Sequence, residues 1–99
     1  MKKVRRKRPT AKLARLERHL EIALDHARPR RDRTRSARYA AALAEQVGWI
    51  ERPHGCSWCR RRRNLERHHW DYDEPLNVTF LCSDCHHIAD VMLYAAVTA

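Results

Sequence analysis

Residues 56–86 read CSWCRRRRNLERHHWDYDEPLNVTFLCSDCH and contain two C-x-x-C pairs. Cys56 and Cys59 form the first pair, Cys82 and Cys85 form the second, and 22 residues separate them. Thiolates at this spacing bind one zinc ion from a tight turn, and four of them complete a tetrahedral shell. Because such a shell has no open position, the pattern predicts a structural rather than a catalytic zinc ion. Two disulfides or free buried thiols are the alternative.

The size of the chain and its N-terminal segment favour a metal site over disulfides. A chain of 99 residues has a small core, which usually needs an additional staple. The basic N-terminus MKKVRRKRPT is not followed by an apolar signal segment, and no stretch approaches the roughly 18 apolar residues of a membrane span. We therefore expect an intracellular, cytoplasmic protein that has no membrane partner. In the cytoplasm cysteines stay reduced, which favours metal binding over disulfides.

The residues between and after the cysteine pairs predict two short strands and a helix. The strands are expected at residues 64–70 and 77–81, joined by a turn rich in Asp and Pro at 71–75. Helical spacing of apolar residues then runs from about residue 83 to residue 96. The expected buried face of this helix consists of Ile88, Val91, Met92 and Ala95.

The N-terminal half predicts two helices. Residues 10–27 and 34–47 space their apolar side chains three or four apart, as helices that bury one face do. Thr10 is the expected N-cap of the first helix, Pro29 ends it, and the charged segment 30–33 connects it to the second. The expected buried side chains are Leu13, Leu16, Leu20, Leu24 and Ala27 in the first helix, and Ala37, Ala40, Leu43, Ala44 and Val47 in the second.

The sequence as a whole predicts an α+β protein. A basic, disordered arm occupies residues 1–9, a helical hairpin residues 10–48, and a zinc-stapled module residues 54–96. Two glycines are few for a chain of this length, and no repeat is visible.

The charge is uneven along the chain, whose formal net charge is +9. Residues 1–38 hold 15 Lys and Arg against 4 acids, whereas residues 39–99 hold 6 against 8. Such asymmetry favours a polyanionic partner, most often nucleic acid, over a merely solvated basic face. The side chains expected to contact phosphates are Arg5, Arg6, Lys7, Arg8, Arg60, Arg61, Arg62 and Arg63. Trp58 and Trp70 are expected to pack on the zinc core rather than to stack on bases.

A His pair, an Asn and a His follow one another between the cysteines. The stretches LERHH at 65–69 and NVTFLCSDCH at 77–86 resemble the HNH nucleases with the ββα-metal fold. The resemblance covers roughly residues 54–92 and is closest to small zinc-stapled HNH proteins of phages and bacteria. It implies metal-dependent hydrolysis of phosphodiester bonds, of double-stranded DNA by analogy. A non-catalytic zinc-finger DNA-binding protein that keeps the fold is the alternative.

The resemblance also implies roles for individual residues. His69 takes the position of the general base, and Asn77 that of the residue bracing the loop that carries it. His68, His86 and Asp90 take positions that hold a catalytic divalent ion such as Mg²⁺, Mn²⁺ or Ni²⁺. A further three acids, Asp71, Asp73 and Glu74, either ligate metal or form the turn. His68 and His69 are neighbours on a strand, so we expect a twist or bulge to bring both to one site.

Overall fold

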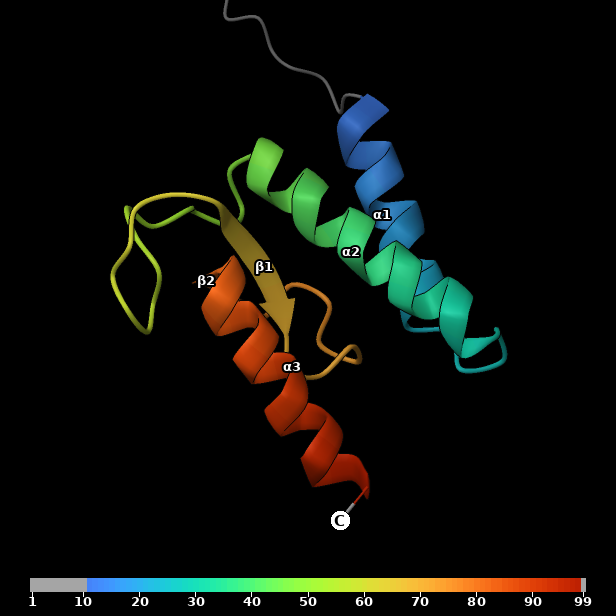
Figure 1. Cartoon of the computed structure of the whole chain (residues 1–99). Coiled ribbons are helices and arrows are strands. Elements are labelled where there is room, and N and C mark those ends of the chain that lie inside the picture. Colours follow the sequence, from blue (N-terminus) through green and yellow to red (C-terminus); the bar gives the residue numbers. More distant parts are fainter. Residues whose placement is uncertain (1–10, 99) are drawn as a thin grey trace, which may run out of the picture.

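The computed structural model describes residues 11–98, without the side chains of residues 97 and 98, and its fold is α+β (Figure 1). The basic arm of residues 1–9 and the expected N-cap Thr10 lie outside the described residues. The elements in chain order are α1 (Ala11–Ala23), α2 (Arg30–Gln46), β1 (Leu65–His69), β2 (Val78–Cys82) and α3 (Ser83–Thr98). Within residues 11–98, no helix is long and apolar enough to cross a membrane.

Helices α1 and α2 form the expected hairpin and cross each other (Figure 1). Their core consists of Leu16 from α1 and of Ala40, Leu43 and Ala44 from α2. Alanines on α2 let the two backbones approach closely, and the core therefore rests on small residues facing leucines. The predicted apolar face is wrong at its end, because Leu24 is 49% exposed and Ala27 is exposed as well.

The boundaries between the two helices also differ from the prediction. Helix α1 ends at Ala23, and α2 begins at Arg30 instead of residue 34. Asp25 turns the chain by accepting a hydrogen bond from the amide of Ala27 through its side chain. Pro29 does not merely stop the first helix; its carbonyl accepts the amides that open the second. Arginine is a good helix former, so the charged segment extends α2 rather than connecting two helices.

Strands β1 and β2 pair antiparallel, close to the predicted bounds. Their register runs without interruption from Leu65 opposite Cys82 to His69 opposite Val78, so the expected bulge is not present. Helix α3 covers the sheet, and the core between them contains Leu81, Cys85 and Ala89. The β-branched and aromatic residues of β2 suit a pleated, half-buried strand.

The buried face predicted for α3 is wrong. Ile88, Val91 and Met92 are each about half exposed, and Ala95 is exposed. The inward stripe instead contains Cys85 and Ala89, with the polar ligand-type residues beside them. Apolar periodicity misleads here because a two-stranded sheet covers only a narrow strip of the helix, and that strip is occupied by cysteine and histidine.

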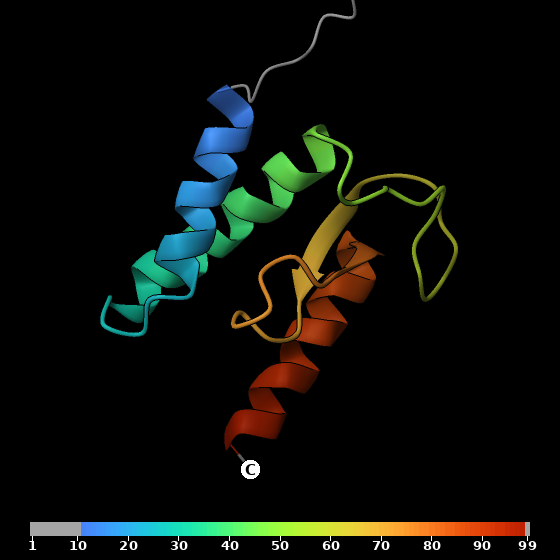
Figure 2. The ribbon, with the colours of Figure 1, turned by 180° about the vertical axis from the view of Figure 1, so that it is seen from behind.

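The loop between β1 and β2 joins the hairpin to the C-terminal unit, which comprises the first cysteine pair, β1, β2 and α3. Leu76 packs against the hairpin core, Arg33 on α2 forms an ion pair with Asp73, and Arg38 donates to the Tyr72 hydroxyl at 3.3 Å. Figure 2 shows this loop, in orange, between the strands and α2. The hairpin therefore supports the loop that follows the histidine pair.

A second link is an ion-pair network around Glu45 at the end of α2. Its carboxylate accepts hydrogen bonds from Arg52, before β1, and from Arg67 on β1, the latter at 2.6 Å. The hydrogen bond from Arg52, assisted by that from Arg67, holds the pKa of Glu45 below its ordinary value of 4.5, although burial opposes this. The carboxylate therefore stays ionised well into the acid range.

We expect Glu45→Gln to lower the free energy of unfolding at pH 7 by about 1–2 kcal/mol, the order of a partly screened charged hydrogen-bond pair. Because the pKa is depressed in the folded chain, the stabilisation is complete above the unfolded pKa and disappears as pH falls through the folded pKa. Urea unfolding of both proteins at several pH values measures this difference. The exposed Glu51→Gln is the control, and an equal loss in both variants would contradict the prediction.

Candidate metal centres and the adjacent cleft

The four cysteines meet at one point, as predicted. Their sulfur atoms all lie within 4.8 Å of one another, none is in a disulfide, and the Sγ atoms of Cys59 and Cys82 are 3.6 Å apart. Four sulfurs at the usual Zn–S distance of about 2.3 Å from one ion lie about 3.8 Å apart. The cluster can therefore hold a structural metal ion such as zinc.

The turns that carry the cysteines point backbone amides at the sulfurs. The amides of Trp58 and Cys59 each donate to Cys56 Sγ at 3.4 Å, and the amide of Cys85 donates to Cys82 Sγ at 3.5 Å. Gly55 is required beside the first turn, because a Cβ there would lie 2.8 Å from the carbonyl oxygen of Arg60. These amides stabilise thiolates, which are the form that binds metal.

The thiols do not ionise with equal ease. Burial opposes ionisation of Cys56, but the amides of Cys59, Cys82 and Trp58 outweigh it and lower the pKa of the thiol to about 6. Burial, together with the neighbouring thiols, raises the pKa of Cys85 to about 12. Four thiolates in one place repel each other, and a divalent cation is the partner that removes this conflict.

A second cluster of ligand-type residues joins β1 to α3. The ligand atoms of His68, His86 and Asp90 all lie within 4.8 Å of one another. Asp90 Oδ1 lies 3.3 Å from His68 Nδ1 and 3.7 Å from His86 Nε2. His68 Nε2 is buried and has no hydrogen-bond partner within residues 11–98. A buried imidazole nitrogen without a partner is unfavourable, and a metal ion would satisfy it.

Glu66, which was not among the predicted site residues, completes the surroundings of this cluster. Its Oε1 lies 2.7 Å from Nδ1 of His86 and so fixes the orientation of that ring. Strand alternation places Glu66 on the same face of β1 as His68, two residues on, and this face is covered by α3. Alternation was the signal that could have identified it.

His69 lies at the other side of β1, next to the loop. Only 3% of the residue is exposed, and its Nε2 donates to the Pro75 carbonyl oxygen at 2.8 Å. Its ring stacks on that of Tyr72, with the two ring centroids 4.8 Å apart. With Nε2 as the donor, the lone pair resides on Nδ1. Burial lowers the pKa of His69, and the charges of Arg38 and Arg67 lower it further against the effect of the carbonyl. The imidazole is therefore neutral near pH 7.

Asn77 lies in the loop directly before β2 rather than on the strand. Its side chain donates to Glu74 Oε1 at 2.9 Å, and its amide donates to the Glu74 carbonyl at 3.0 Å. These contacts close the turn that presents the Pro75 carbonyl to His69. Asp71 accepts the amide of Asp73 at 2.8 Å in the same turn. The acids of this loop, Asp71, Asp73 and Glu74, form the turn and belong to neither ligand cluster in the described part of the chain.

A cleft of about 410 Å³ is lined both by His69 and by two members of the His68, His86 and Asp90 cluster. His69 from β1 and both His86 and Asp90 from α3 line it. Three arginines that sequence reasoning missed, Arg38, Arg52 and Arg67, line the same cleft. They come from three separate segments, so no local pattern could have singled them out.

The arginines predicted to contact phosphates lie apart from this cleft where the structure describes them. Arg61 pairs with Asp84 at 2.9 Å, and the other three of the block, Arg60, Arg62 and Arg63, are exposed in the turn after the first cysteine pair. Arg5, Arg6, Lys7 and Arg8 lie outside the described residues.

Chemically, the chain offers a closed four-thiolate shell and, beside it, a set of two imidazoles and a carboxylate. The second set provides three ligands, so other groups can complete the coordination of an ion placed there. A neutral imidazole and several guanidinium groups share its cleft. Comparison of the chain with protein-family models, with curated proteins and with solved structures finds no match.

Proposed function

We propose that this chain is a metal-dependent nuclease of the HNH type, which hydrolyses phosphodiester bonds in nucleic acid, and in DNA by the family resemblance. The observation that supports the proposal is the cleft that His69 shares with His86 and Asp90. A base and a metal must act on the same phosphate, and one cleft lined by both sets of residues allows this.

The residues of the cleft have distinct roles in this proposal. His68, His86 and Asp90 would hold a divalent ion such as Mg²⁺, Mn²⁺ or Ni²⁺, which supplies positive charge to the phosphate and the leaving oxygen. His69 takes the proton from the attacking water through Nδ1, since Nε2 is engaged with Pro75. Its lowered pKa keeps it in the basic form at neutral pH.

The surrounding residues orient the base and bind the substrate. The Pro75 carbonyl and the Tyr72 ring fix the His69 imidazole, and the Asn77–Glu74 hydrogen bond holds the turn in place. Arg38 is the cleft cation that no carboxylate within the described residues neutralises, since Arg52 and Arg67 pair with Glu45. Arg38 therefore contributes most to attracting the phosphate.

One observation favours the alternative, a non-catalytic zinc-finger protein that binds DNA. His69 is 3% exposed, and both its ring face and Nε2 are already in contact with the loop. A histidine can serve as a packing residue in this way without any chemistry.

Incubation of supercoiled plasmid with the zinc-loaded chain and added Mg²⁺, Mn²⁺ or Ni²⁺ separates the two functions. Nicking supports the nuclease. Plasmid that stays intact under every metal, together with a circular DNA single strand that also stays intact, supports the alternative.

Nucleic-acid binding should depend strongly on salt. Residues 1–8 contain six Lys and Arg, which can neutralise phosphates but carry few means of reading bases. Deleting Met1–Arg8 should weaken binding to all sequences and reduce the slope of log affinity against log salt by up to about 0.9 for each phosphate that is no longer neutralised. Fluorescence anisotropy at several salt concentrations measures both. A chain in which uncharged Ser replaces these six cations is the control for length, and an unchanged slope would identify the segment as a solubility tail.

A further inference from the structure

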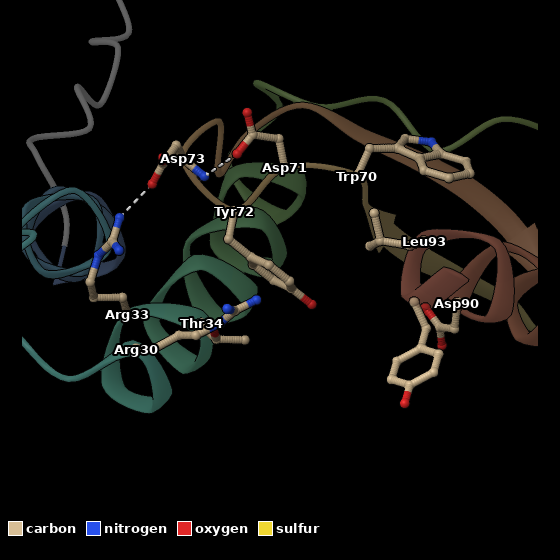
Figure 3. A pocket seen from close by; sticks show the side chains of 10 residues that line it. Arg30, Arg33, Thr34, Trp70, Asp71, Tyr72, Asp73, Asp90 and Leu93 are labelled. Atoms are coloured by element: carbon tan, nitrogen blue, oxygen red, sulfur yellow. Dashed lines mark hydrogen bonds and ion pairs between the residues drawn. The ribbon is translucent and has the colours of Figure 1, made fainter. Parts of the chain in front are cut away.

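A second cavity, of about 520 Å³, lies next to the cleft and has no role in the proposed hydrolysis. It is formed by α2, by the loop after β1 and by α3 (Figure 3). Three aromatic side chains line it, Trp70, Tyr72 and Tyr94, and we call it the aromatic cavity. Figure 3 shows Tyr72 between Arg30 and Thr34 on one side and Leu93 and Asp90 on the other.

We infer that the aromatic cavity binds one unpaired base of a single-stranded nucleic acid whose adjacent phosphate lies in the cleft. The inference rests on the proposed function and names the class of substrate for it. Aromatic side chains stack on any base, and this contact gives single-strand binding much of its affinity.

The aromatic rings are exposed enough for a base to stack on them. Trp70 is 39% exposed and Tyr94 is 69% exposed. Trp70 was expected to pack on the zinc core, and its ring does lie beside that of Trp58, with the two centroids 6.1 Å apart. Trp70 is nevertheless held in place, because its Nε1 donates to Thr79 Oγ1 at 3.3 Å and its ring meets His68 edge to face at 4.3 Å. A fixed, partly exposed ring loses little freedom when a base stacks on it.

The charges of the aromatic cavity suit a neutral ring rather than a phosphate. Three carboxylates line it, and each already has a partner: Asp73 with Arg33, Asp71 with the Asp73 amide, and Asp90 with His68. Asp71 and Asp90 have no Lys or Arg partner within the described residues, so their charge disfavours a phosphate inside the cavity but not an uncharged base. The side chain of Arg30, on the α2 side of the cavity, has no partner within the described part of the chain, so it can bind the phosphate that stays outside the cavity on the far side of the base.

The position of the aromatic cavity defines the substrate. Tyr72 and Asp90 line both the cleft and the aromatic cavity, so the two spaces are adjacent. A phosphate in the cleft therefore brings its own base within reach of the cavity. In a duplex that base is paired and stacked, and must leave the helix to enter a pocket. A single strand has no such penalty.

The test compares strands that differ only in their bases. The zinc-loaded full chain, with no second metal added, is titrated with labelled oligothymidine of 12 nucleotides and with a 12-mer of abasic nucleotides, which carry the same charge. Wild type should prefer the strand with bases by about tenfold or more, the order of one stacking contact. Tyr94→Ala should remove most of this preference and leave affinity for the abasic strand unchanged. Oligouridine run in parallel should show the same preference, because stacking does not require a particular sugar.

Matched variants make the result specific. Tyr39→Ala removes a tyrosine that is 52% exposed on α2 outside the aromatic cavity, and should keep the full preference. Thr34→Phe should fill the cavity and lose the preference, as an independent check on Tyr94→Ala. A 12-base-pair duplex should bind wild type and Tyr94→Ala equally. Equal affinity of wild type for both single strands, or equal behaviour of the Tyr39 and Tyr94 variants, would overturn the inference.

The two proposals fail in different ways. Binding is read without added divalent ion, so base preference is measured independently of hydrolysis. If plasmid and a circular DNA single strand both stay uncut with every metal while the base preference depends on Tyr94, the nuclease is overturned and the aromatic cavity is supported. Metal-dependent nicking without that preference supports the nuclease and overturns the aromatic cavity.

Discussion

Cys82→Ser should unfold the C-terminal unit, residues 54–92, and abolish tight zinc binding. Cys82 is buried, and its sulfur accepts the amide of Cys85 and contacts Cys59. A structural zinc site contributes roughly 10–16 kcal/mol at neutral pH, which is as large as the whole stability of a small domain, about 5–15 kcal/mol. The remaining core of this unit is too small to replace it. Elemental analysis should find one zinc ion per wild-type chain, and circular dichroism should show that the variant has less structure.

Ser57→Ala provides the matched control, because Ser57 lies inside the first C-x-x-C pair but is exposed and is not a ligand. It should retain zinc and structure. Native protein without zinc, or a circular dichroism spectrum that a strong chelator leaves unchanged, would refute the structural zinc site.

The second large effect concerns His69. Replacing it should lower the rate of plasmid cleavage by about 10²–10⁴-fold, the usual contribution of a general base. Zinc content and DNA affinity should stay nearly unchanged, since His69 belongs to neither ligand cluster. His69→Ala also removes the hydrogen bond to Pro75 and the stacking on Tyr72, so it should loosen the loop. His69→Gln can keep a donor for the Pro75 carbonyl but is not a base, and it should be equally inactive.

Variants of two further histidines distinguish the role of the general base from that of the metal ligands. His86→Ala should lose cleavage and weaken the response of cleavage to added divalent metal, because its ring contributes to the ligand set. His87 is its exposed neighbour and lies in neither cluster, so His87→Ala should cleave like wild type. Equal nicking by wild type and by both His69 variants would mean that another group is the base or that the nicking comes from a contaminant.

The features that could be predicted from the sequence are those encoded locally. The cysteine pairs were found because metal ligands are specified by residue type and short spacing, which tertiary structure does not alter. The hairpin core at Leu16, Ala40 and Leu43 was found because helical periodicity marks a face buried against another helix. The triad of His68, His86 and Asp90 was suggested only by resemblance, and the structure brings these residues together.

The remainder depends on contacts between distant segments. Arg38, Arg52 and Arg67 line one cleft only because the hairpin is held against β1, where Glu45 of α2 pairs with Arg52 and Arg67. The inward face of α3 was mispredicted for a related reason. Ala89 and Cys85 are buried while Met92 is half exposed, since the sheet is narrow and the strip of α3 that contacts it carries cysteine and histidine instead of the large apolar residues.

The loop at residues 71–77 limits how far this protein can be taken apart. By sequence it lies inside the C-terminal unit, but Asp73, Tyr72 and Leu76 are held by the hairpin. Residues 54–98 therefore cannot be moved to another protein by themselves without losing contacts that hold this loop. A chimera that carries residues 54–98 on another protein would keep the four-cysteine cluster but lose the support of the loop that holds Pro75, on which the orientation of His69 depends. A transplant that keeps the orientation of His69 therefore has to include α1 and α2.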